Sequence, residues 1–192
     1  MAHEQLLRLF LAVDLPDGFR RTLAKLQTRL KPVYSTGTFG LPENFHITLH
    51  FLGDTAVSRL PLLLDALRQI EMPQLELRPD ALVHFPSAHK ARVAAVTTAG
   101  DVALLADLHA RLSPVIKDLG FRLEGRAFKP HVTIARFKFP PPADAVGHAV
   151  EVARSLLERS PGDHVRQFTL FQSTLDSKGP RYAALGRFPR QL

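Results

Sequence analysis

The chain has 192 residues, of which 45% are hydrophobic and 22% are charged, an ordinary globular composition that excludes a disordered or fibrous protein. It contains no cysteine, which excludes disulfides, thiolate catalysis and cysteine-based metal sites and favours a reducing, cytoplasmic location. The 25 Lys and Arg against 18 Asp and Glu give a net charge of +7, which favours an anionic partner such as a phosphate ester or RNA, although scattered charges are equally typical of a solvated surface.

The first half of the chain predicts a strand, a helix, a loop and a second strand. Residues 8–15 (RLFLAVDL) have strand composition, and this run is too short to be a signal peptide or a membrane span. A helix is then predicted with Asp17 as its cap and an apolar stripe at Phe19, Leu23, Leu26 and Leu30. A polar loop leads to the strand ENFHITLHFLG, and a further helix is predicted over residues 60–70, with Ser58 as its cap.

The second half repeats this order. A strand is predicted at residues 91–98, followed by a helix that Asp101 caps and Gly120 ends. Pro114 predicts a kink or a break in this helix. Its apolar stripe consists of Leu105, Leu108, Leu112, Val115 and Leu119. A second motif strand, a PPPAD loop, a helix over residues 149–159 and closing strands over residues 165–175 and 182–188 follow. The repeated order predicts two similar lobes in an α+β fold with largely antiparallel sheets.

Two apolar strands carry the same His-x-Thr motif. His46 and Thr48 lie in ENFHITLHFLG, and His131 and Thr133 lie in KPHVTIARF. Because side chains alternate along a strand, each imidazole shares a face with its hydroxyl, about 6 to 7 Å away, while the intervening apolar residues pack inward. Each motif can therefore contact one phosphate, and two facing lobes would bring both histidines to one cleft.

Several segments, in the same order, resemble the 2H phosphoesterase superfamily, and within it the RNA 2′,3′-cyclic phosphodiesterases, also called 2′-5′ RNA ligases. These segments are RLFLAVDLP, ENFHITLHFLG, LGFRLEGRAFKPHVTIARFK and FTLFQSTLDSKGPRYAALGRF. The resemblance implies a single bilobal domain over residues 1–192, in which each lobe is an antiparallel sheet backed by helices. It also implies that the motifs at residues 46–49 and 131–134 line a central cleft and that no metal or cofactor is required. Ala95 stands near a position where relatives often carry an aromatic residue, so part of the cleft wall is expected to differ.

The resemblance further implies hydrolysis of an RNA or nucleotide 2′,3′-cyclic phosphate to a 2′-phosphomonoester, with 2′-5′ ligation as the reverse activity. Histidine titrates near neutrality, so one imidazole can act as base and the other as acid on opposite sides of the phosphorus. The resemblance implies that His46 donates the proton and His131 accepts one. Thr48 and Thr133 are expected to hold the non-bridging oxygens of the phosphate as charge develops.

Two further residues are candidates for substrate binding. Phe10 shares a strand face with Arg8 and Ala12, so it can stack on a nucleobase if that face is the cleft; an ordinary core position is as compatible with the pattern. Arg136 matches an arginine that follows the second motif in relatives. Strict alternation points it away from His131, so this assignment requires a bulge, a strand end or a long reach.

Two other classes of protein stay open at this point. A zinc hydrolase would use His46, His50 and His131, although no carboxylate stands at a matching position and no His-Glu-x-x-His motif occurs. A non-catalytic RNA-binding module would bind RNA without turnover. We expect a monomer that acts on RNA ends or small cyclic-phosphate nucleotides, away from membranes; the pattern assigns no role to Tyr182 or Ser173.

Overall fold

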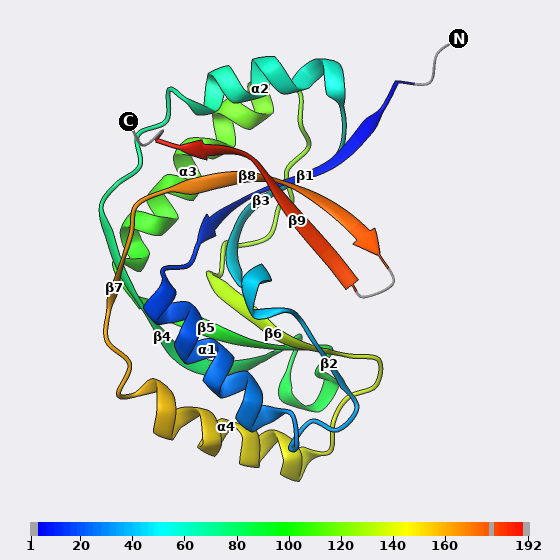
Figure 1. Cartoon of the computed structure of the whole chain (residues 1–192), viewed down its shortest axis with the longest axis vertical. Coiled ribbons are helices and arrows are strands. Elements are labelled where there is room, and N and C mark those ends of the chain that lie inside the picture. Colours follow the sequence, from blue (N-terminus) through cyan, green and yellow to red (C-terminus); the bar gives the residue numbers. More distant parts are fainter. Residues whose placement is uncertain (1–3, 177–178, 190–192) are drawn as a thin grey trace.

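Two antiparallel sheets lie in the middle of the molecule in the computed structural model, which describes residues 4–176 and 179–189 (Figure 1). The strand order is β3-β1-β8-β9 in the first sheet and β2-β6-β5-β4-β7 in the second. The strands are β1 (Leu6–Asp14), β2 (Gly37–Phe39), β3 (His46–Ala56), β4 (Leu75–Phe85), β5 (Val93–Gly100), β6 (His131–Phe137), β7 (Asp163–Val165), β8 (Phe168–Asp176) and β9 (Gly179–Phe188). The predicted α+β class is therefore confirmed.

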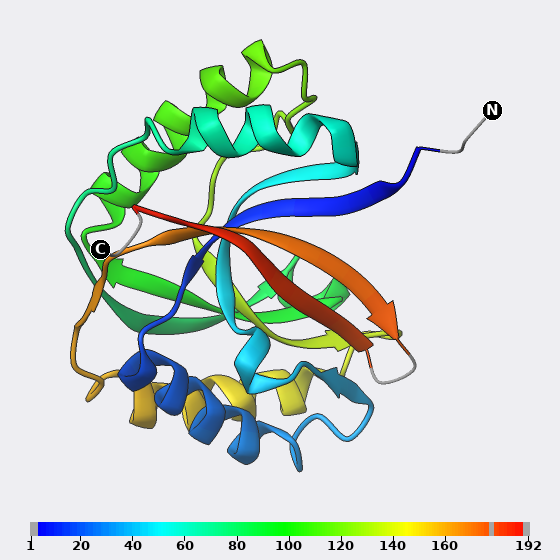
Figure 2. The same cartoon turned by 45° about the horizontal axis from the view of Figure 1, so that its top comes forward.

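The described residues form four helices, two at each end of the molecule (Figures 1 and 2). These are α1 (Asp17–Leu30), α2 (Leu60–Leu67), α3 (Val102–Asp118) and α4 (Ala143–Leu157). Helices α1 and α4 pack against each other and against β4, whereas α2 and α3 pack together at the other end. Short 3₁₀ turns, η1 (Pro42–Asn44), η2 (Val57–Arg59) and η3 (Ala88–Lys90), join some of these elements. Within the described residues, no helix has both the length and the apolar character that crossing a membrane requires.

The repeated order of elements corresponds to two similar lobes. In the first half β1 and α1 precede the motif strand β3, and in the second half β5 and α3 precede the motif strand β6. Strand β3 pairs directly with β1, and β6 pairs directly with β5. Each motif strand therefore lies beside the strand that opens its own half, as the repeat in the sequence predicts.

The apolar stripe of α1 is confirmed, but the predicted caps of α1 and α2, Asp17 and Ser58, are not. All four stripe residues are at most 2% exposed: Phe19, Leu23, Leu26 and Leu30. Asp17 is the first helical residue, and Pro16 occupies the cap position without a side-chain hydrogen bond. Ser58 lies inside η2, so Arg59 precedes α2. Proline suits a helix start because its fixed φ and missing N–H cost nothing there.

Helix α3 runs through Pro114 without interruption, so the predicted break is wrong. The helix buries Leu105, Leu108, Leu112 and Ile116 completely, and this packing outweighs the loss of one backbone hydrogen bond at the proline. Asp101 does occupy the cap position, yet its carboxylate accepts a hydrogen bond from the Glu76 backbone N–H at 2.8 Å instead of capping the helix. Gly120 follows the helix with a φ of 78°, in the left-handed region that favours glycine.

Strand β4 was not predicted, although it lies inside the second sheet between β5 and β7. Its sequence contains Pro79, which normally argues against an interior strand. The pairing of β4 with β5 shifts register between Pro79 and Leu82, and such an irregularity accommodates a residue that has no N–H to donate.

Helix α4 also begins six residues before its predicted start at residue 149, because Pro142 provides its cap position.

The buried apolar side chains form two separate clusters. The larger cluster contains side chains from both sheets and from all four helices. The smaller one consists of Phe10, Ala12 and Phe171, with Tyr182 packed against it. Because Phe10 and Ala12 alternate along β1 with members of the larger cluster, this small aromatic cluster lies on the opposite face of the first sheet.

Candidate active site

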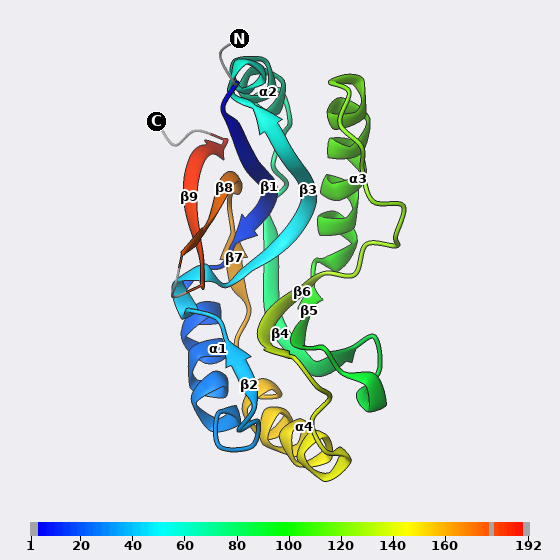
Figure 3. The same cartoon turned by 90° about the vertical axis from the view of Figure 1, so that its right-hand side faces the viewer.

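The two motif strands lie side by side although they belong to different sheets (Figure 3). Cα atoms of β3 and β6 approach within 8 Å of one another. His46 is the first residue of β3, and His131 is the first residue of β6. The fold therefore brings the two His-x-Thr motifs from separate halves of the chain to neighbouring strands.

A β-bulge in β6 determines where Arg136 points. His131 and Thr133 are half-buried, whereas Ile134 and Ala135 are both buried, so the alternation of the strand breaks at this step. The pairing with β5 shifts register at the same place, passing from Thr133 to Ala135. A bulge of this kind returns the following residue, Arg136, to the face of His131. Of the three conditions that would bring Arg136 to the site, a bulge, a strand end or a long reach, the bulge is present.

Strand β3 carries an equivalent bulge. Leu49 and His50 are both buried, and the pairing with β1 shifts register here, passing from Thr48 to His50. Phe51 thereby returns to the face of His46, and its side chain is 53% exposed. The burial patterns of the two strands match over their first seven residues. Phe51 therefore occupies, in the first half, the position that Arg136 has in the second.

A backbone carbonyl orients each motif histidine. His46 Nδ1 donates to the carbonyl oxygen of Asn44 at 2.7 Å, and His131 Nδ1 donates to that of Lys129 at 2.6 Å. Because a carbonyl can only accept, Nδ1 carries the proton in both neutral rings. Each histidine thus presents its Nε2 atom for proton transfer, and His46 Nε2 lies 3.1 Å from the hydroxyl oxygen of Thr48.

An aromatic wall surrounds His46. The ring centroid of Phe10 lies 5.0 Å from that of His46, and Tyr182 packs edge-on against His46 at 5.2 Å. Phe10 also stacks on Phe171 at 5.2 Å. Phe10 lies on the predicted face of β1, but its side chain is only 3% exposed. The buried Phe10 ring therefore packs against His46 and is not available to a ligand. The exposed aromatic side chain next to Phe10 is Phe51, and the centroids of these two rings are 6.1 Å apart.

The charges around His46 connect the two halves of the site. Burial lowers the pKa of the His46 imidazole, and the positive charges of Arg136 and His131 lower it further. The hydrogen bond to Asn44 and the charge of Asp14 act in the opposite direction. Because Arg136 and His131 both act electrostatically on His46, the charged groups of β3 and β6 share one site.

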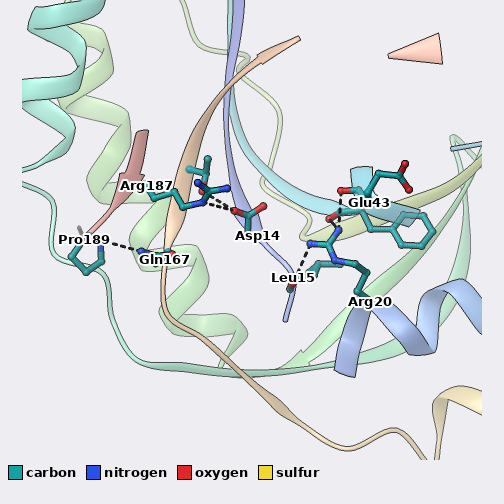
Figure 4. A network of polar contacts seen from close by, with 9 residues as sticks. Asp14, Leu15, Arg20, Glu43, Gln167, Arg187 and Pro189 are labelled. Atoms are coloured by element: carbon teal, nitrogen blue, oxygen red, sulfur yellow. Dashed lines mark hydrogen bonds and ion pairs between the residues drawn. The ribbon is translucent and has the colours of Figure 1, made fainter. Parts of the chain in front are cut away.

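Asp14 is a functional candidate that the sequence analysis missed. It is the register partner of His46 at the end of the β1–β3 pairing. Its Oδ2 accepts a hydrogen bond from Thr169 Oγ1 at 2.9 Å and lies 3.7 Å from Arg187 Nε, as Figure 4 shows for Asp14 and Arg187. These contacts hold a carboxylate beside the motif histidine. In the sequence the only signal of its presence is a charged residue that interrupts the apolar run LFLAVDL.

Two residues without an assigned role lie beside the aromatic wall. Ser173 pairs with Arg8 in the β1–β8 ladder and with Tyr182 in the β8–β9 ladder, so it shares their sheet face. Burial raises the pKa of the Tyr182 hydroxyl, and the positive charges of Arg136 and Arg8 oppose this shift. The positive charge of Arg136, which lies on the second sheet, therefore acts on Tyr182 of the first sheet.

His50 points away from this site, which corrects the three-histidine zinc hypothesis. Its Nε2 donates to the carbonyl oxygen of His109 on α3 at 3.0 Å, and its ring stacks on the His109 ring at 4.1 Å. His109 in turn stacks on Phe128 at 4.2 Å. The bulge in β3 turns His50 toward the helix, so His46, His50 and His131 do not converge on one point. Strand parity alone would place His50 on the face of His46, so only the bulge separates the two residues.

Comparison with known proteins identifies related chains. A protein-family model described as "LigT like Phosphoesterase" matches residues 13–95 and 98–182. An RNA 2′,3′-cyclic phosphodiesterase of Archaeoglobus fulgidus is 32% identical over 185 residues, which cover 95% of this chain and 99% of that protein. A protein of the same name from Thermus thermophilus is 32% identical and covers 95% of this chain and 89% of its own length.

Solved structures have the same fold. The crystal structure of a Thermus thermophilus protein superposes with a TM-score of 0.71 at 30% identity, covering 94% of this chain and 96% of that one. A crystal structure of E. coli LigT complexed with 3′-AMP superposes with a TM-score of 0.76 at 24% identity, covering 96% of this chain and 98% of that one. At this lower identity the second comparison bears on the fold alone.

Proposed function

This chain belongs to the LigT-like phosphoesterase family, and on that basis we propose that it hydrolyses RNA or nucleotide 2′,3′-cyclic phosphates to 2′-phosphomonoesters. Its relatives in Archaeoglobus fulgidus and Thermus thermophilus carry the name RNA 2′,3′-cyclic phosphodiesterase. The observation that carries the proposal is the matched pair of histidines. Each directs Nδ1 to a carbonyl two residues earlier in the chain and leaves Nε2 available, from two different sheets.

In the proposed reaction His131 Nε2 takes a proton from a water molecule as the water oxygen attacks phosphorus. The bond between phosphorus and the 3′ oxygen breaks, and His46 Nε2 gives a proton to that leaving oxygen. The phosphate stays on the 2′ oxygen. The step is balanced: the water oxygen forms the new bond to phosphorus, His131 ends the step protonated, and His46 ends it neutral.

Burial lowers the pKa of His46 and so disfavours the charged form that a general acid needs, whereas a bound phosphate would favour that form. Burial favours the neutral imidazole in the empty site. A phosphate monoanion placed between the motifs would favour the charged form, because an opposite charge nearby stabilises it. Thr48, Thr133 and Arg136 would hold the non-bridging oxygens, since their hydroxyl and guanidinium groups are strong donors to phosphate.

The substrate's base would meet the exposed ring of Phe51 on the site face. Base stacking on an aromatic side chain contributes about 1 to 3 kcal/mol in nucleic-acid binding proteins. Phe10 would contribute to this contact indirectly, by supporting the wall that Phe51 and Tyr182 extend. RNA ends and small cyclic-phosphate nucleotides both fit this description. A cytoplasmic location is consistent with the absence of cysteine, which suits a reducing compartment, and we propose that the protein acts there as a monomer.

Phosphorus NMR of a 2′,3′-cyclic nucleotide incubated with the protein in EDTA tests the activity. We expect the cyclic phosphate signal to convert to that of a 2′-phosphate. A 3′-phosphate product would contradict the choice of leaving oxygen. Activity that EDTA abolishes and zinc restores would contradict the two-histidine mechanism, and RNA binding without turnover would contradict the enzymatic function.

His46→Ala and His131→Ala test the catalytic roles. Each substitution removes one proton-transfer group, so turnover should fall by about 10²- to 10⁴-fold while the fold is retained. His148→Ala provides the matched control, because His148 is an exposed histidine on α4 and should leave turnover unchanged. Full activity in either motif variant would refute the role assigned to that histidine.

A further inference from the structure

Arg20 holds together the chain segments that meet at His46. Its side chain extends from α1, and Nη2 donates to the carbonyl oxygen of Leu15 at 3.1 Å, just beyond the end of β1. Its Nη1 shares its two hydrogens among three carbonyl oxygens in the turn before β3: Pro42 at 3.1 Å, Glu43 at 2.9 Å and Phe45 at 3.3 Å. Figure 4 shows the guanidinium of Arg20 between Leu15 and Glu43.

These contacts surround the group that orients His46. Among the four successive carbonyls of residues 42–45, Arg20 takes three, and the remaining one, that of Asn44, accepts the hydrogen bond from His46 Nδ1. The contact of Arg20 with the Leu15 carbonyl is equally close to the site. Leu15 follows Asp14, and Asp14 is the register partner of His46. Arg20 therefore closes the β1–β3 ladder immediately beyond its last pair.

Asn44 is held from a second direction as well. Its side-chain Nδ2 donates to the Pro180 carbonyl oxygen of β9 at 2.7 Å. Tyr182, two residues further along β9, packs edge-on against His46. The turn that carries the accepting carbonyl is thus tied to α1 on one side and to the wall of the site on the other.

The second motif shows why the accepting carbonyl of the first one needs hydrogen bonds from Arg20. In the second motif Pro130 stands between the accepting residue, Lys129, and the histidine. Proline fixes its own φ near −65°, so the carbonyl before it has little freedom relative to His131. The corresponding residue in the first motif is Phe45, which has no such restriction. Hydrogen bonds from outside the motif can supply the missing rigidity.

We propose that Arg20 is a positioning residue for His46. By holding the carbonyls on both sides of Asn44, it orients the Asn44 carbonyl that receives the Nδ1 proton, which keeps the neutral ring in one tautomer with Nε2 directed at the substrate. A guanidinium suits this task because its planar, permanently charged fork donates several hydrogen bonds in fixed directions. Arg20 acts through the backbone, so its contribution to catalysis rests on the function proposed above, whereas its effect on the His46 tautomer does not.

The test compares Arg20→Met and Arg20→Lys with Arg21→Met, which removes the same charge from the next, exposed position of α1. In Arg20→Met we expect kcat for a 2′,3′-cyclic nucleotide to fall roughly 10- to 100-fold, because small misplacements of a catalytic group have effects of this size. KM should stay within about twofold, since no substrate contact is lost. Arg20→Lys should fall between wild type and Arg20→Met, and Arg21→Met should behave as wild type.

Nitrogen-15 NMR of the His46 ring provides the readout that a general structural role would not change. The wild-type ring should show the Nδ1–H tautomer, and Arg20→Met should show a mixture of both tautomers. An unchanged tautomer in Arg20→Met would overturn the proposal, whether or not activity falls. If Arg20→Met does not fold, Arg20→Lys takes its place in both measurements. Wild-type protein that fails to hydrolyse the nucleotide would refute the proposed function, and the tautomer comparison would still decide the role of Arg20.

Discussion

His46 must carry a proton at a position that disfavours its charged form. Burial lowers the pKa of its imidazole, and the positive charge of Arg136 acts in the same direction, as does a proton on His131. The negative charge of Asp14 opposes them. Because Thr169 and Arg187 hold the Asp14 carboxylate in place, this opposing charge belongs to the fold and does not depend on substrate.

Asp14→Asn should therefore shift the pH dependence of the reaction. Loss of the carboxylate removes an attraction for the imidazolium, so the pKa of His46 falls further. An acid must be protonated to act, so the alkaline limb of the profile of kcat/KM against pH should move to lower pH. Activity at pH 7 and above should fall, while the acidic limb should change less.

The pH profile of Asp17→Asn serves as the control. Asp17 is an exposed carboxylate in the first turn of α1, so this variant has the same change of net charge away from the site. Its profile should match that of the wild type. An Asp14→Asn profile that also matched the wild type would show that Asp14 does not influence the proton on His46.

At the scale of elements, the paired bulges in β3 and β6 decide which side chains reach the site. Each bulge inserts one residue into the alternation, which directs Phe51 and Arg136 to the face of the histidines. The bulge in β3 also turns His50 toward α3. One local irregularity therefore provides both an exposed aromatic ring at the site and a contact between the motif strand and a helix.

The contact between β3 and α3 should make the stability of the protein dependent on pH. Burial and, as the smaller cause, the charge of His50 together lower the pKa of His109 to about 4. Burial also lowers the pKa of His50, as does the charge of Lys117, while the bond to the His109 carbonyl opposes this. An unfolded histidine has a pKa of about 6.5 and binds protons more readily than these rings do. The stabilisation is therefore complete above about pH 6.5 and is lost as the pH falls toward about 4.

Urea unfolding at a series of pH values measures this effect. His109→Phe keeps a ring between His50 and Phe128 but cannot titrate, so its unfolding midpoint should fall less steeply with decreasing pH than that of the wild type. His148→Phe alters an exposed histidine on α4 and should keep the wild-type slope. Equal slopes in wild type and His109→Phe would contradict a role for this ring stack in acid sensitivity.

At the scale of the whole molecule, the net charge of +7 should make substrate capture depend on salt. Positive surface potential raises the local concentration of an anionic substrate, and dissolved ions screen it. KM for an RNA ending in a cyclic phosphate should rise between about 0.05 and about 0.2 M salt, with little change in kcat. A cyclic mononucleotide should show a smaller rise, because it has fewer phosphates. Identical salt dependence for the two substrates would indicate that only the cyclic phosphate contacts the basic surface.

The repeat in the chain and the arrangement of the sheets agree at this scale. Two similar lobes, each with its motif strand beside its opening strand, follow from the order of elements in the sequence. That residues 1–192 form a single domain stays a prediction.

The sequence by itself determined the features that depend on near neighbours. The stripe of α1, the closing strands and both motif strands were predicted correctly, because burial imposes a period of 3.6 on helices and of 2 on strands. The two His-x-Thr motifs were recognisable for the same reason. The family resemblance rested on these short segments and their order along the chain.

Only the tertiary structure decided the rest of the site. A bulge depends on the register of the neighbouring strand, so the positions of Phe51 and His50 could not be predicted from alternation. For Arg136 the bulge could be stated only as one of three possible conditions. The contacts of Asp14 with Thr169 and of Arg20 with the turn before His46 join residues that are distant in the sequence. Periodicity reports which side of an element is buried, whereas the partners of a polar side chain are set by how the elements pack.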